Sequence, residues 1–175
     1  MSAKNDSGDR ATSGLPDFTP IADLSNRSTR DLERKTIESL LPHRDPFLFV
    51  DTIDVNDNDT IIARHVFSEN EFFFKGHFPE YPVVPGVILV ETMAQAGGAG
   101  LVKRGILGGN SLFFLATVDK VKFRRQVRPG EEAVLVIKNL RVSPKMIKQS
   151  GMVYIAGELA SEAEWMCLVG DKGDL

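Results

Sequence analysis

The stretch PGVILVETMAQAGGAGLVK, residues 85–103, decides the fold class because it predicts one helix that is buried nearly all round. Apolar residues cover most of the circumference of this helix, and the leading proline is tolerated in a first helical turn. Each of Gly97, Gly98 and Gly100 would cost about 1 kcal/mol of helix stability relative to alanine. We therefore expect neighbouring strands to pack closely against the helix at these glycines.

The segments on both sides of this helix favour β-structure. A short helix is expected first, from a capping pattern at Ser28 to a stop at Pro42. Strands are then expected at Phe47–Val55, Thr60–Phe67, Ser111–Phe123 and Glu132–Val142, with two more between Lys145 and Val169 that join near Gly157. Several of these are long for strands, so the sheet should curve strongly. The predicted fold class is α+β, a long central helix wrapped by a curved antiparallel sheet.

The length and composition fit one soluble domain with a tail. Residues 1–26 are rich in Ser, Asp, Gly and Pro and are expected to be disordered, whereas residues 27–175 are expected to form the domain. The apolar share of 42%, the charged share of 26% and the net charge of −3 are ordinary for a globular protein. No secretory signal is predicted, because the first thirty residues contain no continuous apolar core. No membrane span is predicted, because the longest apolar run is interrupted by a charge. We expect a cytoplasmic protein.

Residues that could hold a metal or a cofactor are sparse. The single cysteine, Cys167, excludes an internal disulfide and an all-cysteine metal cluster, and we expect it in the core. The three histidines lack paired spacing. The glycines at 97–100 lie inside a helix, whereas phosphate-binding glycines precede one. We expect no cofactor and no metal.

Two residues of the central stretch stand out chemically. Glu91 is the only charged residue between Val87 and Val102, and His77 lies fourteen residues before it, in GHFP. Taken alone, such a histidine is more often a structural hydrogen-bond donor, and such a glutamate is more often paired with an arginine or exposed to solvent. Gln95 follows one helical turn after Glu91 and could orient its carboxyl group, with a purely structural role as an equal alternative. The other two histidines, at positions 43 and 65, are interpreted as structural.

Three runs carry a resemblance to a known family: LLPHRDPFLFVD at 40–51, GHFPEYPVVPGVILVETMAQ at 76–95 and DKVKFRRQVRPGE at 119–131. They resemble the (3R)-hydroxyacyl-acyl-carrier-protein dehydratases of type II fatty acid synthesis, the FabZ-like enzymes with a hotdog fold. The resemblance implies a dehydratase that acts without a cofactor on 3-hydroxyacyl chains carried by an acyl carrier protein. It also implies that His77 and Glu91 are the catalytic pair, completed across the interface of a homodimer. Hexamers that are trimers of dimers are frequent in the family.

These residue types suit the removal of water from a β-hydroxy thioester. The reaction needs a base for the proton next to the carbonyl, an acid for the departing hydroxyl, and a donor for the enolate-like oxygen. The neutral imidazole of His77 can act as the base, and the carboxyl group of Glu91, among apolar residues, can stay protonated and act as the acid. The backbone N–H groups of Gly86 and Val87, at the start of the helix, are the predicted donors to the oxygen.

A basic run lies within the third motif, at Lys120, Lys122, Arg124, Arg125 and Arg128. Such a run is usually a solvated strand face. Here Arg124 and Arg125 are candidates for docking an acidic carrier protein, because complementary charges steer the encounter of two proteins. Nucleic acid fits less well, since the chain as a whole is acidic.

Three other functions stay open at this point: a dehydratase that also isomerises the double bond, an acyl thioesterase, and a non-catalytic module that binds acyl chains. Glu91 argues against the first, because isomerising relatives carry aspartate there. The pairing of GHFP with Pro-Gly argues against the second, and the presence of both His77 and Glu91 against the third. Trp165 and Cys167 depart from the smaller or aliphatic residues expected in the last strand. These two residues leave the preferred acyl chain length open. The sequence also leaves open whether the acyl chain is carried by a carrier protein or by coenzyme A.

Overall fold

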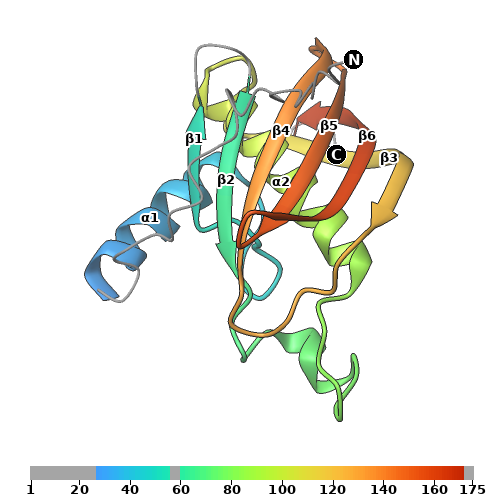
Figure 1. Cartoon of the computed structure of the whole chain (residues 1–175). Coiled ribbons are helices and arrows are strands. Elements are labelled where there is room, and N and C mark those ends of the chain that lie inside the picture. Colours follow the sequence, from blue (N-terminus) through green and yellow to red (C-terminus); the bar gives the residue numbers. More distant parts are fainter. Residues whose placement is uncertain (1–26, 56–59, 172–175) are drawn as a thin grey trace, which may run out of the picture.

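The computed structural model describes residues 27–55 and 60–171. The predicted tail, residues 1–26, lies outside the described residues. In chain order the elements are α1 (Arg27–Leu40), β1 (Thr52–Val55), β2 (Thr60–Val66), the short 3-10 helix η1 (Phe72–Lys75), α2 (Gly86–Lys103), β3 (Ser111–Phe123), β4 (Glu132–Ser143), β5 (Met146–Ile155) and β6 (Glu158–Asp171) (Figure 1).

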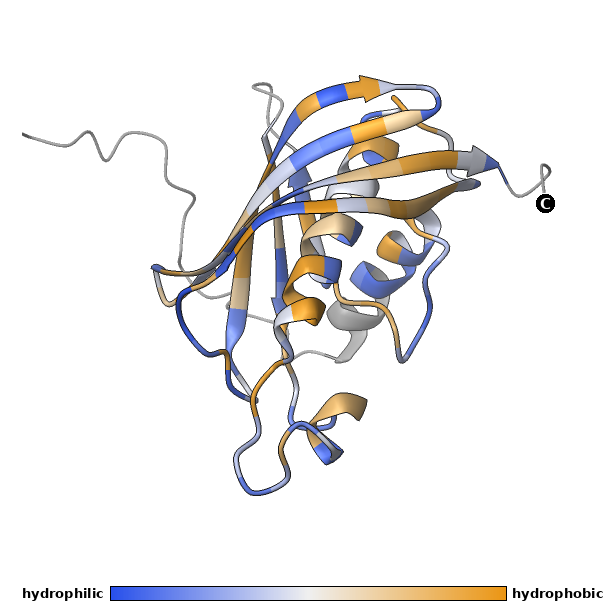
Figure 2. Cartoon of the chain, turned by 90° about the vertical axis from the view of Figure 1, so that its right-hand side faces the viewer, coloured by the Kyte–Doolittle hydropathy of each residue, from blue (hydrophilic) through white to orange (hydrophobic). Residues whose placement is uncertain are grey.

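The six strands form one sheet in the order β1-β2-β4-β5-β6-β3, and every neighbouring pair is antiparallel. Strands β1 and β3 therefore lie at the two edges. Figure 2 shows the sheet bending over α2, which lies against its concave side. The predicted fold class, a central helix wrapped by a curved antiparallel sheet, is confirmed.

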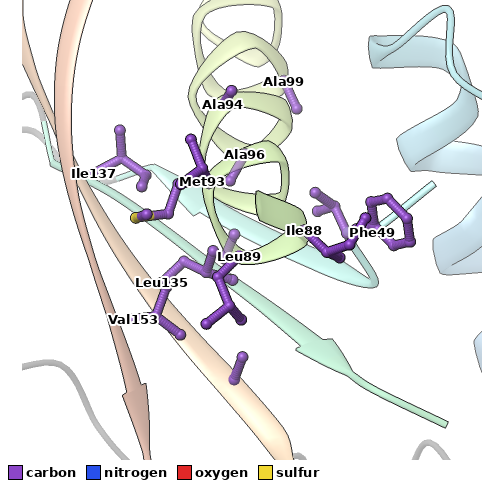
Figure 3. Close-up of a cluster of buried hydrophobic side chains, with 14 of the residues drawn as sticks. Phe49, Ile88, Leu89, Met93, Ala94, Ala96, Ala99, Leu135, Ile137 and Val153 are labelled. Atoms are coloured by element: carbon purple, nitrogen blue, oxygen red, sulfur yellow. The ribbon is translucent and has the colours of Figure 1, made fainter. Parts of the chain in front are cut away.

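Helix α2 has the bounds that the sequence predicted, and it is buried over most of its length. Figure 3 shows Met93 beside Ile137 of β4, and Ile88 beside Phe49 on another side of the helix. Two glycines of α2 allow other side chains to pack closely against the helix. A Cβ atom on Gly98 would lie 3.0 Å from the Phe113 ring, and one on Gly100 would lie 2.5 Å from the Ile61 side chain.

The first predicted strand starts later than expected, because Phe47–Asp51 is not a strand. The side chain of Gln95 on α2 takes the place of a neighbouring strand there. Its Oε1 accepts a hydrogen bond from the backbone N–H of Phe49 (2.9 Å), and its Nε2 donates to the carbonyl of Phe47 (3.1 Å). This segment is therefore fastened to the helix, and strand pairing with β2 begins only at Thr52.

The last two strands join in a tight turn at Ala156 and Gly157, which have φ angles of 49° and 81°. Positive φ values at both central residues are typical of the two-residue turns that join antiparallel strands. The predicted junction near Gly157 is confirmed. Within 27–55 and 60–171, none of the helices is long and apolar enough to cross a membrane.

Candidate active site

His77 lies on the loop between η1 and α2, and backbone hydrogen bonds fix its place. Its N–H donates to the carbonyl of Phe73 (2.9 Å), and its own carbonyl accepts from Val83 N–H (3.2 Å). The imidazole Nδ1 lies 3.0 Å from the carbonyl oxygen of Val83. A carbonyl oxygen only accepts, so Nδ1 carries the proton and the neutral ring keeps a free lone pair on Nε2. The ring is thus set up to take a proton at Nε2.

The loop that carries His77 is fastened to the segment after β3. The guanidinium of Arg128 lies 3.6 Å from the centre of the Tyr81 ring and donates to the carbonyl of Pro82 (3.1 Å). The N–H of Val84 donates to the carbonyl of Val127 (2.8 Å). An arginine over an aromatic face is attractive in itself, so these contacts stabilise one conformation of the loop.

One groove, with a volume of about 480 Å³, gathers five of the predicted site residues: His77, Gly86, Val87, Arg124 and Arg125. The first N–H groups of an α-helix lack intrahelical acceptors and carry partial positive charge. The start of α2 therefore contributes hydrogen-bond donors to the groove that His77 lines.

Glu91 lines a different and much smaller pocket, of about 20 Å³. Its Oε1 accepts a hydrogen bond from Gln95 Nε2 (3.0 Å) and lies 3.5 Å from His43 Nε2. Gln95 therefore plays both roles that the sequence left open, because it contacts the Glu91 carboxyl group and also holds the Phe47–Phe49 backbone. The two polar side chains restrict the carboxyl group to one position.

His43 was interpreted as structural, and its contact with Glu91 was missed. The two residues are far apart in the sequence, and nothing in the periodicity of either segment connects them. Burial lowers the pKa of His43, against the opposite effect of the nearby Glu91 charge. The imidazole is therefore neutral near neutral pH.

Cys167 lies in the wall of the Glu91 pocket and is buried, as predicted. Burial, with a smaller effect from the Glu91 charge, raises the pKa of its thiol to about 12. The reactive form of cysteine is the thiolate, so this side chain is not a nucleophile at neutral pH.

A single chain thus places the two predicted catalytic residues in separate pockets. His77 shares a groove with the start of α2, whereas Glu91 shares a pocket with His43 and Gln95. Within the part of the chain that the structure describes, no three His, Cys, Asp or Glu side chains are grouped to hold a metal ion.

The cations of the basic run are largely paired with glutamates of the same chain. Arg124 Nη2 lies 2.7 Å from Glu162 Oε1, and Arg125 Nη2 lies 2.7 Å from Glu131 Oε1. A further contact of 3.1 Å joins Arg125 Nε to Glu158. These pairs support the solvated-face interpretation in part, while both arginines still line the His77 groove.

Comparison with known proteins identifies the family. A family model described as the FabA-like domain matches residues 41–166. The chain belongs to this family. It is 39% identical over 142 residues to the 3-hydroxyacyl-acyl-carrier-protein dehydratase FabZ of Geobacillus sp. (strain WCH70), covering 81% of this chain and 97% of that protein. It is also 39% identical over 154 residues to the FabZ dehydratase of Oleidesulfovibrio alaskensis, covering 87% and 100%.

Solved structures show the same fold at low identity. The dehydratase heterocomplex ApeI:P from Xenorhabdus doucetiae matches with a TM-score of 0.66 and 17% identity, over 78% of this chain and 92% of that one. Zebra fish thioesterase superfamily member 2 matches with a TM-score of 0.55 and 11% identity, over 82% and 96%. The predicted hotdog fold and the resemblance to FabZ-like dehydratases are confirmed.

Proposed function

We propose that this FabA-like protein is a hydro-lyase that converts (3R)-3-hydroxyacyl-acyl-carrier-protein to the trans-2-enoyl thioester in type II fatty acid synthesis. The matches to FabZ dehydratases at 39% identity cover 97% and 100% of the length of those proteins. The observation that carries the chemistry is the contact between His77 Nδ1 and the Val83 carbonyl oxygen, which leaves Nε2 free to accept a proton. The reaction uses no cofactor.

In the proposed reaction, His77 Nε2 removes the proton from the carbon next to the thioester carbonyl. The electron pair moves towards the carbonyl oxygen, where the N–H groups of Gly86 and Val87 stabilise the developing charge. The carboxyl group of Glu91 gives a proton to the β-hydroxyl, the carbon–oxygen bond breaks, and water leaves as the double bond forms. Return of the proton from His77 to Glu91 through solvent completes the cycle.

This reaction needs His77 and Glu91 at one substrate, so we propose that two chains share each site. Strand β3 lies at an edge of the sheet, and four of its large apolar side chains are at least 40% exposed: Phe114, Leu115, Val118 and Phe123. An exposed apolar edge strand is a template for pairing with another chain. A second copy is the partner that fits, because a closed two-fold dimer covers the same edge on both chains.

The pairing of β3 with its copy would also join the two pockets. Leu115 lines the Glu91 pocket, and Phe123, further along β3, lines the His77 groove. Around a two-fold axis near the middle of β3, antiparallel pairing places the Leu115 end of one chain beside the Phe123 end of the other. Each Glu91 then meets the partner subunit's His77. A trimer of such dimers is the larger assembly that the resemblance implies, and the mass in solution distinguishes the two.

Carrier docking at Arg124 and Arg125 is part of the same proposal. Both side chains line the groove of His77, where a phosphopantetheine arm would enter. Acyl carrier protein is acidic, and exposed cations at the rim of a site speed the encounter with it. A cytoplasmic location is also proposed, since this is where such a soluble carrier would be met.

The direct test is an assay on 3-hydroxyacyl thioesters with wild-type protein and two variants. His77→Ala removes the base and Glu91→Gln removes the acid, so each should lower kcat by roughly 10²- to 10⁴-fold. Glu80→Gln, an exposed glutamate in the same motif, is the matched control and should keep the wild-type rate. Folding is checked by circular dichroism.

Three results would contradict the proposed function. The first is a wild-type protein that forms no enoyl thioester, and the second is a folded His77→Ala or Glu91→Gln variant with the wild-type rate. The third is release of free thiol in place of enoyl product, which would indicate a thioesterase.

A further inference from the structure

The inner end of the small Glu91 pocket limits the length of the acyl chain that can bind. Besides Glu91, its described walls are His43, Gln95, Ala94, Phe113, Leu115 and Cys167. Its volume, about 20 Å³, holds little more than one water molecule. An acyl chain of any length therefore needs space beyond the present pocket.

The direction in which an acyl chain would run follows from the positions of the His77 groove and of Glu91. The thioester and the carrier belong on the side of the His77 groove, which is open and carries Arg124 and Arg125. Glu91 meets the β-hydroxyl in the proposed reaction, so the tail of the acyl chain continues past Glu91 in the other direction. This argument rests on the proposed function.

Beyond Glu91, the same face of α2 carries Gln95 on one side and small side chains on the other. Residues three and seven positions later lie on one helical face, and these are Ala94 and Gly98. This face would leave room for an apolar chain. The described walls of the pocket include Ala94 but not Gly98, because the ring of Phe113 lies against Gly98. A Cβ atom on Gly98 would lie only 3.0 Å from that ring.

The geometry points to Phe113 as the residue that sets the acyl chain length, because its ring fills the space beside Gly98 and closes the inner end of the Glu91 pocket. Cys167 adds to the closure, as its side chain occupies another part of the wall. The enzyme thus selects short 3-hydroxyacyl chains. Phe113 acts on the tail of the substrate and not on the reacting atoms.

The test compares kcat/KM for 3-hydroxybutyryl, 3-hydroxyoctanoyl and 3-hydroxydodecanoyl thioesters. The wild-type protein should prefer the butyryl substrate. In Phe113→Ala the ratio of the dodecanoyl to the butyryl value should rise about 10-fold or more, the size of effect that one methylene has in an apolar pocket. The butyryl rate itself should stay near wild type.

Three further variants make the result specific. Phe113→Leu removes less volume and should shift the ratio in the same direction to a smaller extent, which covers the case that the alanine variant does not fold. Adding Gly98→Ala to Phe113→Ala refills the space and should move the ratio back towards short chains. Leu140→Ala, a half-exposed leucine of β4 that does not line the pocket, should leave the ratio unchanged.

The two proposals fail in different ways. If the wild-type protein dehydrates none of the thioesters, the proposed function is wrong. If it does dehydrate them, but folded Phe113→Ala and Phe113→Leu keep the wild-type ratio, then Phe113 does not set the chain length and only this inference is overturned.

Discussion

The carboxyl group of Glu91 is held by two polar side chains that come from different parts of the chain. Gln95 donates to it from one helical turn away, and His43 approaches it from the segment between α1 and β1. If Glu91 is the proton donor, as proposed, this fixed position favours the reaction, since misplacement by about 1 Å can cost about 10²-fold in rate.

His43 gives the fold a dependence on pH. Burial lowers its pKa in the folded protein below the value of about 6.5 expected for the unfolded chain. Between these two values the unfolded chain binds a proton that the folded protein does not, so His43 lowers the free energy of unfolding as the pH falls below about 6.5. Above that pH the effect is absent. The Glu91 charge raises the pKa of His43 and the Arg44 charge lowers it, and the effect of Glu91 is the larger of the two.

We predict that His43→Gln loses less stability than wild type between about pH 7.5 and about pH 5.5, because it removes this one titrating group. Urea unfolding at the two pH values measures the change for each protein. His65→Gln, at the buried histidine of β2, serves as a comparison. An equal loss of unfolding free energy in wild type and His43→Gln would contradict the lowered pKa of His43 in the folded protein.

At this scale the sequence supplied the candidate residues, whose roles stay predictions, and it did not predict the contact between His43 and Glu91. His77 and Glu91 could be named from residue types and from the family motifs that contain them. The contact between His43 and Glu91 could not, because it depends on how the Phe47–Asp51 segment is fastened to α2 by Gln95.

Among the elements, α2 was predicted with its observed bounds and β1 was not. The limits of α2 follow from local signals, Pro85 at one end and the end of the apolar pattern at the other. The start of β1 depends on a distant side chain, since Gln95 occupies the backbone groups of Phe47 and Phe49. The length of β3 was also predicted, but its place at the edge of the sheet is a property of the whole fold.

The basic run that begins in β3 gives a prediction at the level of this element. Arg124→Gln should raise the KM for a carrier-protein substrate about two- to five-fold at low salt, the size of an exposed ion pair. The KM for a short soluble thioester should not change, and the difference should shrink as salt rises, because salt screens exposed charges. Steady-state kinetics at two salt concentrations measures both effects.

The matched control is Lys35→Gln, which removes an exposed cation from α1, on the side of the molecule away from β3 (Figure 1). It should leave both KM values at wild type. Because Arg124 pairs with Glu162, the melting temperature of Arg124→Gln is measured as well. An equal rise in KM for both substrates, independent of salt, would mean that the pair is structural and that the carrier docks elsewhere.

For the whole molecule, the sequence predicted the fold class and the order of the main helices and strands, and the structure agrees with both. The homodimer stays a prediction. Its physical basis is that one chain separates His77 from Glu91 while the apolar edge strand β3 borders both of their pockets. A chain length preference could not be predicted, because it depends on how one ring of β3 meets one glycine of α2.

Mixing two inactive variants tests the shared site most directly. His77→Ala and Glu91→Gln dimers are dissociated reversibly, combined in equal amounts and allowed to reassociate, and heterodimers are identified by a mass tag on one variant. Each heterodimer then contains one site with an intact His77 from one chain and an intact Glu91 from the other. Random pairing makes half of the dimers heterodimers, so the mixture should recover about a quarter of the wild-type activity. No recovery in a sample shown to contain heterodimers would mean that His77 and Glu91 of the same chain serve the same site.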